Sequence, residues 1–378
     1  MKTISYEKIL SDIKYKLDEM MEKIVATDTL EPIAISINGK YTNKMQSFFQ
    51  PGWTYSFYMG MIAMIYLHTG EKRYLKYLED AKETYWRFLY DNTEEIGHDS
   101  GFLYSLYAVV MYKITGNVEY KLLALKAADE LGKRYQFHAG HMQAFYDMRI
   151  RGITDKISLL IVDDMMNMCL LMWAYKETGH SFYRSVYENH ILTSINYLIR
   201  DDYSVRHAYH FDVATGKSIS EMNYCGYAIG SHWARGTAWM IYGLTKALQF
   251  TGDKERYLYA LEGVTQKYLE SLDNPVPLWD FRLPKGEKQY RDSSAAAITS
   301  SAFMEFRHIG VKDSLTQKVE ELSEAAIAEL TSERYYGDNQ QEYILKYIEN
   351  EGSLWGDYFF TELIMKKSYG NKMLDFWI

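Results

Sequence analysis

Six apolar segments, each ending at a glycine, constrain the fold of this chain more than any other feature of its sequence. Hydrophobic side chains cover most of the circumference of each segment, which is typical of a helix buried inside a large core. Glycine readily takes the left-handed conformation that ends a helix. The six glycines, at intervals of 46 to 73 residues, are Gly70, Gly116, Gly179, Gly252, Gly310 and Gly370.

Amphipathic segments alternate with the apolar ones. One such segment follows each of the first four glycines, and another, with apolar residues at helical spacing from Ile4 to Ile24, starts the chain. This alternation predicts helical hairpins with an apolar inner helix and an amphipathic outer helix. Six hairpins closed in a ring give an (α/α)6 barrel, so we expect an all-α fold in a single domain, residues 1–378. An open helical array is the alternative, but it would not explain such uniformly apolar inner helices.

The composition argues against several classes of protein. A formal net charge of −8 disfavours nucleic acid as the main partner. Cys169 and Cys225 are isolated thiols, so neither a disulfide framework nor a zinc site is indicated. No apolar run is long enough to span a bilayer, and the N-terminus lacks the pattern of a signal peptide. We therefore expect a cytoplasmic protein without a membrane partner.

Residues that carry chemistry gather just before, or at the start of, the six apolar segments. They are Trp53; His98 and Asp99; Asp163 and Asp164; Trp233 and Arg235; Arg291, Asp292 and Ser293; and Trp355 and Asp357. In a barrel these positions meet at one mouth. A helix N-cap is the simpler interpretation of an aspartate or serine there, and we prefer it for Asp292, Ser293 and Asp357. The whole set predicts a pocket for a negatively charged polar ligand, because helix N-termini and arginine favour anions.

Several motifs together resemble the unsaturated glucuronyl hydrolases of glycoside hydrolase family 88, from about Trp53 to the last predicted helix. The motifs, in chain order, are HDSGF (98–102), VDDMMN (162–167), HAYHFDVATG (207–216), HWARGTAW (232–239), WDFRLP (279–284), RDSSAAAI (291–298) and LWGDYFF (354–360). The resemblance implies an (α/α)6 barrel, the same fold that the repeats predict. It also implies hydration of the vinyl ether between C4 and C5 of a 4,5-unsaturated uronic acid at a non-reducing end. The resulting hemiketal opens and releases the neighbouring sugar.

The resemblance also implies roles for individual residues. Asp163 matches the general acid/base, which protonates C4 and activates water for C5, and Asp99 matches a second carboxylate that holds sugar hydroxyls. Asp164 is interpreted as an ordinary carboxylate of a first helical turn. No metal or organic cofactor is implied. The candidate substrate-binding residues, of which Trp53 matches a stacking aromatic, are Trp53, His98, Phe145, His207, Cys225, Arg235, Trp239 and Trp355.

Elementary electrostatics supports acid/base work by the two carboxylates. A nearby anionic Asp99 would raise the pKa of Asp163 and so keep a proton on it. This effect has to outweigh the pull of the helix N-terminus, which favours the ionised form.

Two departures from the family pattern concern the neighbouring sugar. Tyr224-Cys225 stands where members that act on glycosaminoglycans have His-Gln, and Phe145 stands where a second stacking tryptophan is expected. A smaller, weaker hydrogen-bonding residue at position 225 predicts a preference for unsulfated disaccharides or for another glycan. Two alternatives remain: an unsaturated rhamnogalacturonyl hydrolase acting on pectin fragments, and a glycan-binding toroid without catalysis. The sequence does not indicate an oligomeric state.

Overall fold

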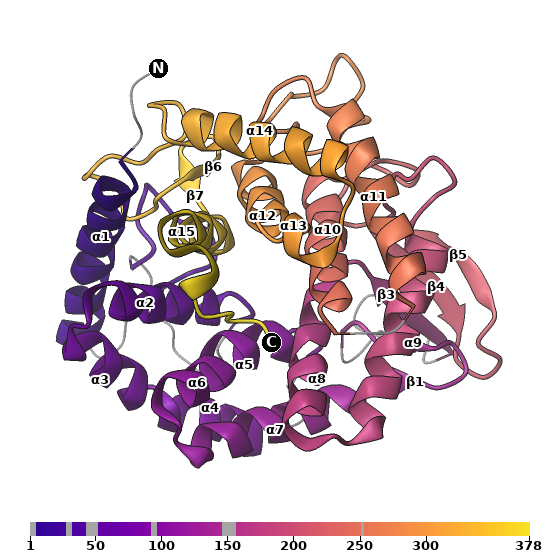
Figure 1. Cartoon of the computed structure of the whole chain (residues 1–378), viewed down its shortest axis with the longest axis horizontal. Helices are drawn as coiled ribbons and strands as arrows, with labels where there is room; N and C mark the ends of the chain where they lie inside the picture. The colour runs from indigo at the N-terminus through magenta and orange to yellow at the C-terminus, as the bar shows by residue number, and fades with distance from the viewer. Residues whose placement is uncertain (1–4, 28–31, 43–51, 92–96, 146–155, 251–252) are drawn as a thin grey trace.

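The computed structural model describes residues 5–27, 32–42, 52–91, 97–145, 156–250 and 253–378. Two concentric rings of helices surround a common centre (Figure 1). The inner ring contains α2 (Tyr55–Thr69), α5 (Ser100–Tyr104) with its continuations η2 (Ser105–Val109) and α6 (Val110–Thr115), α8 (Asp164–Thr178), α10 (Ala234–Leu248), α12 (Ser293–Phe303) and α15 (Leu354–Tyr369). The outer helices are α1 (Tyr6–Thr27), α3 (Lys72–Asp80), α4 (Lys82–Asp91), α7 (Val118–Gly132), α9 (Ser181–Leu198), α11 (Lys254–Ser271) and α14 (Asp313–Leu330). The predicted (α/α)6 barrel is confirmed.

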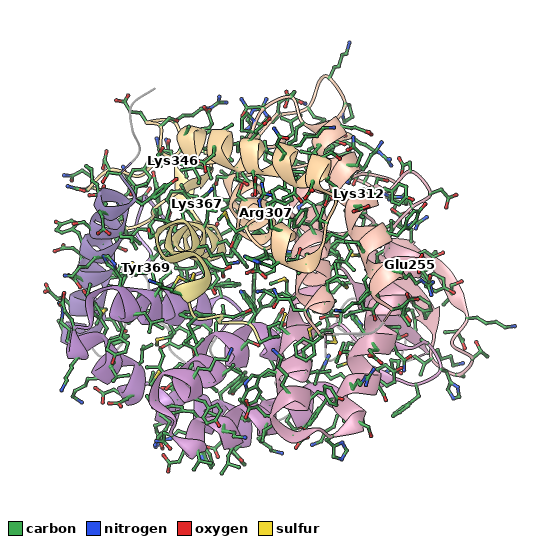
Figure 2. The ribbon with its side chains drawn as sticks, in the orientation of Figure 1. Glu255, Arg307, Lys312, Lys346, Lys367 and Tyr369 are labelled. Carbon is green, nitrogen blue, oxygen red and sulfur yellow. The ribbon has the colours of Figure 1, made fainter. Side chains whose placement is uncertain are left out.

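The apolar segments form the inner ring because burial on all sides is the only environment that suits them. Every residue of α10 except Arg235 is buried, and every residue of α12 is buried. Charged side chains such as Glu255 and Lys312 instead lie on the outside of the ring (Figure 2). Among the helices that the structure describes, none has the length and apolar content that a membrane crossing requires.

Glycine ends three of the inner helices as predicted. Gly70, Gly116 and Gly179 are left-handed, and their N–H groups donate to the carbonyl four residues earlier at 2.7, 2.8 and 2.7 Å. The other three predicted ends differ. α10 ends at Leu248, and Gly252 lies outside the described residues. α12 ends at Phe303, so that Gly310 ends the separate short helix α13 (Phe306–Ile309). At Gly370 a 3₁₀ turn begins with φ 56° and ψ −134°, which is not the left-handed cap.

A three-stranded antiparallel sheet interrupts the helical pattern, which the all-helical prediction missed. It contains β3 (Ile157–Ile161), β4 (Ala208–Asp212) and β5 (Ser218–Met222), with β4 in the middle. Two-stranded pairs are formed by β1 (Tyr135–Gln136) with β2 (His141–Met142), and by β6 (Lys346–Ile348) with β7 (Glu351–Gly352). In the register of β3 and β4, Ile161 is opposite Ala208, and the N–H of Val162 donates to the carbonyl of His207 at 3.0 Å. The sheet thereby brings His207 beside the start of α8.

Candidate active site

Asp99 and Asp163 occupy the N-cap positions of α5 and α8, yet neither side chain caps its helix. Other aspartates at such positions do cap: Asp253 accepts the N–H of Arg256 at 3.1 Å, and Asp292 accepts that of Ala295 at 3.0 Å. A cap would occupy the carboxylate oxygens with backbone hydrogen bonds. The carboxylates of Asp99 and Asp163 are therefore not occupied by capping bonds.

Gly101 of the HDSGF motif allows α5 and α8 to approach closely. A Cβ atom at this position would lie only 2.3 Å from the Cα atom of Asn167 on α8. Any side chain here would therefore keep the two helices further apart. The contact is stabilised by the Asn167 side chain, whose Oδ1 accepts the N–H of Phe102 at 2.9 Å. Asp99 and Asp163 both lie at the site end of this helix contact, and that places their charges within electrostatic reach of each other.

Asp163 is the carboxyl group with the environment of a general acid. Burial raises its pKa from 3.8 to about 7; Arg235 opposes the rise, and the charge of Asp99 adds to it. From sequence we expected the charge of Asp99 to raise the pKa of Asp163, whereas burial is the largest cause in the structure. The Oδ2 atom of Asp163 has no hydrogen-bond partner among the described residues and lies 3.9 Å from Nε2 of His207. Oδ2 itself is buried, although 20 % of the Asp163 side chain as a whole is exposed.

Asp99 has a similar but weaker shift. Burial raises its pKa to about 6, while a hydrogen bond from Asn167 and the charge of Arg134 oppose the rise. Its Oδ2 lies 3.5 Å from Nε2 of His98, and 27 % of its side chain is exposed. Asp163 therefore keeps its proton to a higher pH than Asp99 does.

Two backbone N–H groups hold the imidazole of His207. Those of Tyr224 and Cys225 each donate to Nδ1 at 3.2 Å, so the ring hydrogen is on Nε2, the atom that faces Asp163. Burial, followed by the charge of Arg235, lowers the pKa of His207 to about 3. His207 is consequently a neutral donor beside Asp163. The ring of Tyr224 packs against it with centroids 3.9 Å apart.

His98 is held in the same way by Phe145. The N–H of Phe145 donates to Nδ1 of His98 at 2.9 Å, which leaves the hydrogen on Nε2, facing Asp99. Phe145 adopts a φ of 58°, uncommon for a residue with a side chain, and its carbonyl accepts a hydrogen bond from Arg134. A strained backbone of this kind persists only when its surroundings impose it, and it recurs at functional sites. Phe145 also packs edge-on against His98, with centroids 4.9 Å apart.

Arg235 is the one residue of α10 that is not fully buried, and aromatic rings surround it. Its guanidinium carbon lies 4.7 Å from the ring centroid of Trp233 and 5.1 Å from that of Trp355. Nη1 binds Oδ2 of Asp292 at 3.0 Å and also donates to the hydroxyl of Tyr347. Part of its charge is thus compensated within the protein. It remains close enough to Asp163 to lower the pKa of that carboxyl.

Tryptophan side chains line and support this end of the barrel. Trp53 stacks on Trp355 with centroids 5.2 Å apart and an interplanar angle of 24°. Trp239 is fully buried, and its indole N–H favours the ionised form of Asp163 and so lowers the pKa of that carboxyl. Trp53 is only partly buried and can stack on a ligand, whereas Trp239 is fully buried beneath the carboxylate.

A family model described as Glycosyl Hydrolase Family 88 matches residues 30–361. The chain belongs to glycoside hydrolase family 88. It is 31 % identical over 333 residues to an unsaturated glucuronyl hydrolase of Bacillus sp. (strain GL1), covering 84 % of this chain and 86 % of that protein. It is also 31 % identical over 334 residues to an unsaturated chondroitin disaccharide hydrolase of Streptococcus pyogenes serotype M1, covering 83 % and 80 %.

Solved structures of unsaturated glucuronyl hydrolases have the same fold. The crystal structure of the unsaturated glucuronyl hydrolase from Bacillus sp. GL1 superposes with a TM-score of 0.86 at 27 % identity, covering 97 % of this chain and 98 % of that one. That of the Streptococcus agalactiae enzyme gives a TM-score of 0.85 at 26 % identity, covering 97 % and 93 %. The family shows that this chain is a glycosidase.

Some interpretations from sequence need correction in this family 88 structure. Asp164 is fully buried and its pKa is raised well above the ordinary value, so it is not an ordinary carboxylate of a first helical turn. Ser293 does not cap α12, since its hydroxyl donates to the carbonyl of Lys346. Asp357 lies within the first turn of α15, which Ser353 caps. Its carboxylate binds the hydroxyl of Tyr41 and the N–H of Leu345, both at 2.8 Å.

Sequence reasoning also missed residues that shape the site. Asp292 was interpreted only as a cap, but it caps α12 through Oδ1 and binds Arg235 through Oδ2. Asn167 and Tyr347 were not singled out, although the N of the VDDMMN motif was visible. In the part of the chain that the structure describes, no three His, Cys, Asp or Glu side chains are arranged to hold a metal ion.

Proposed function

We propose that this family 88 protein releases the 4,5-unsaturated uronic acid from the non-reducing end of oligosaccharides by hydrating its C4=C5 bond. The observation that carries the proposal is Asp163, a carboxyl that caps no helix, has an unpartnered oxygen and has a pKa of about 7. The names of the relatives from Bacillus and Streptococcus pyogenes support the same substrate class.

In this mechanism Asp163 acts first as acid and then as base. Its protonated carboxyl gives the proton to C4, and positive charge develops at C5 and the ring oxygen. The carboxylate left behind takes a proton from the water that adds to C5, so Asp163 returns to its starting state. The hemiketal formed at C5 then opens and the neighbouring sugar leaves. The charge of Asp99 helps to hold the proton on Asp163 before the reaction.

The other site residues bind and orient the sugar. Trp53 stacks on the sugar face, with Trp355 behind it. Asp99 accepts hydrogen bonds from sugar hydroxyls, and the neutral Nε2–H groups of His98 and His207 are donors at the same site. Arg235 binds the uronate carboxylate, since Asp292 compensates only part of its charge. Trp239 lies beneath Asp163 and favours the ionised form of its carboxyl.

Phe145 and Cys225 face the neighbouring sugar and determine which one is accepted. The position of Cys225 next to His207 and within reach of the charge of Arg235 supports this assignment. We further propose that residues 1–378 act as a single catalytic domain and that no metal or organic cofactor is needed, so that turnover should survive treatment with EDTA.

Loss of the ultraviolet absorbance of the C4=C5 bond on mixing with an unsaturated disaccharide tests the proposal. The absorbance should fall with the wild type and should not fall with Asp163→Asn. It should also fall with Asp164→Asn, which keeps the shape of a buried acid whose charged form burial disfavours. A panel of disaccharides made by chondroitin, heparin and pectin lyases separates this function from rhamnogalacturonyl hydrolysis. Binding without any loss of absorbance would instead indicate a glycan-binding protein.

A further inference from the structure

The last described segment of the chain fills the centre of the barrel at the end opposite Asp99 and Asp163. After α15 the chain turns back, and the segment Met373–Ile378 runs into the middle of the ring (Figure 1). Phe376 and Trp377 are each 1 % exposed. The inner helices begin at the site and end near this segment, so the segment closes the far end of the barrel.

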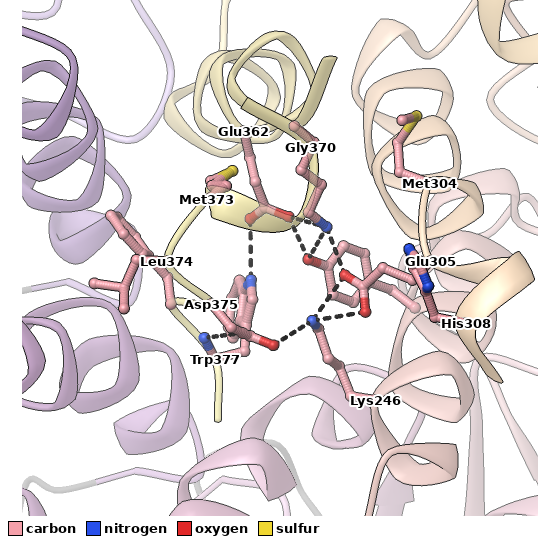
Figure 3. A pocket seen from close by; sticks show the side chains of 13 residues that line it. Lys246, Met304, Glu305, His308, Glu362, Gly370, Met373, Leu374, Asp375 and Trp377 are labelled. Atoms are coloured by element: carbon pink, nitrogen blue, oxygen red, sulfur yellow. Dashed lines mark hydrogen bonds and ion pairs between the residues drawn. The ribbon is translucent and has the colours of Figure 1, made fainter. Parts of the chain in front are cut away.

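Buried polar contacts anchor this segment (Figure 3). Oδ2 of Asp375 binds Nζ of Lys246 at 2.9 Å, and Oδ1 accepts the N–H of Trp377 at 2.8 Å. The indole N–H of Trp377 donates to Oε2 of Glu362 at 3.1 Å. Lys246 and Glu362, on α10 and α15, are each 1 % exposed. These contacts together hold Trp377 in one orientation. A cavity of about 240 Å³ lies beside them.

Aromatic rings connect Trp377 to Trp239. Trp377 stacks on Phe359 with centroids 5.8 Å apart and an interplanar angle of 8°, and it packs edge-on against Phe102 at 6.0 Å. Phe359 and Phe102 contact Trp239 at 5.4 and 5.6 Å. Trp377 thus supports both rings on which Trp239 rests, and Trp239 lies beneath Asp163.

We propose that Trp377 is a positioning residue that acts on the reaction through Phe102, Phe359 and Trp239, from the opposite end of the barrel. The inference rests on the proposed function. Interiors are close-packed, so removal of an indole lets neighbouring rings move into the space. A displacement of about 1 Å at a reacting group can cost roughly 10²-fold in rate. Because Trp239 is buried beneath Asp163, the displacement should affect proton transfer more than substrate binding.

The experiment compares Trp377 with a matched control, Trp173. Trp173 is also 1 % exposed and lies on α8. Among the described residues its ring packs against that of Tyr112, with centroids 6.2 Å apart, and no described ring links it to Trp239. Trp377→Leu should lower kcat at least tenfold with little change in KM, whereas Trp173→Leu should leave kcat near the wild-type value. Trp377→Phe keeps a ring on Phe359 and should restore most of the activity. Equal losses of kcat in the two leucine variants would overturn the proposal.

A second measurement needs no substrate and so separates this inference from the proposed function. In spectra of protein labelled with ¹⁵N-tryptophan, the indole signal of Trp239 is identified by its loss in Trp239→Phe. The signal should move in Trp377→Leu and stay in place in Trp173→Leu. If Trp377→Leu does not fold, the Trp239 signal is measured in Trp377→Phe instead. It should then shift by a smaller amount. An unmoved Trp239 signal in every Trp377 variant would overturn the inference even if the wild type hydrolyses the disaccharide.

Discussion

Replacing Asp163 by asparagine should remove most of the turnover and, above neutral pH, make the protein more stable. Asparagine keeps the shape of the side chain but can neither give nor take the proton. A positioned general acid contributes about 10²–10⁴-fold, so kcat should fall by at least that factor. The gain in stability has a separate cause, because the folded protein holds the ionised carboxylate at an energetic cost.

The magnitude follows from the shift in pKa. Asp163 ionises near 3.8 in the unfolded chain and near 7 in the folded protein. A raised pKa of an acid means that the folded state binds the proton more tightly, so the wild type loses stability as the pH rises between these values and no further above them. Each unit corresponds to about 1.4 kcal/mol, which gives a cost of roughly 4 kcal/mol at high pH as an upper figure. Between about pH 5 and about pH 8 the cost grows by roughly 2–3 kcal/mol.

The assay is denaturant unfolding of the wild type and Asp163→Asn at both pH values, beside kcat measured by loss of absorbance. Taking the difference between the two pH values cancels the part of the substitution's effect that does not depend on pH. Asp357 offers a matched control, because burial also raises its pKa to about 7 but it lies in a separate contact with Tyr41. Asp357→Asn should show the same dependence of stability on pH and keep most of its kcat.

Two results would refute this reasoning. If Asp163→Asn changes stability equally at both pH values, burial does not hold a proton on Asp163. If it retains turnover close to the wild type, the proton comes from another group and the proposed mechanism is wrong at its centre.

The remaining predictions concern the neighbours of Asp163. Asp99→Asn should lower turnover and shift the alkaline limb of the pH profile of kcat/KM to lower pH, since Asp99 raises the pKa of Asp163; an unmoved limb would contradict this. Arg235→Ala should raise KM for the uronate and also destabilise the protein, because Asp292 would stay buried without its partner. The double variant with Asp292→Asn, which keeps the cap of α12 but removes the buried charge, should recover stability but not KM, and recovery of both would assign Arg235 a structural role only. Cys225 should favour unsulfated disaccharides, and faster hydrolysis of a sulfated chondroitin disaccharide than of its unsulfated counterpart would rule that out.

The helical barrel was predictable because it depends on patterns between residues close in the chain. An apolar circumference marks an inner helix, and the left-handed Gly70, Gly116 and Gly179 end their helices as predicted. The strands β3 and β4 were missed because their short apolar runs, ISLLI and AYHFD, were not distinguishable from helix or loop by periodicity. These segments form strands because they pair with each other, although almost 50 residues separate them in the chain.

The composition of the site was also visible in the motifs, and the family resemblance implied roles for Asp99 and Asp163, but local sequence alone did not separate a cap from a functional carboxylate. Asp99, Asp163 and Asp292 all stand at helix N-cap positions, where residue type alone fits either a cap or a functional group; the sequence interpretation preferred a cap for Asp292 and functional roles for Asp99 and Asp163. Only the tertiary structure shows that Asp292 caps and pairs with Arg235, while the other two do neither. The physical reason is that a cap is a contact within one turn, whereas burial, the largest cause of the pKa of Asp163, is set by side chains from several helices. Sequence therefore determined which groups reach the mouth of the barrel, and tertiary packing determined which of them holds a proton.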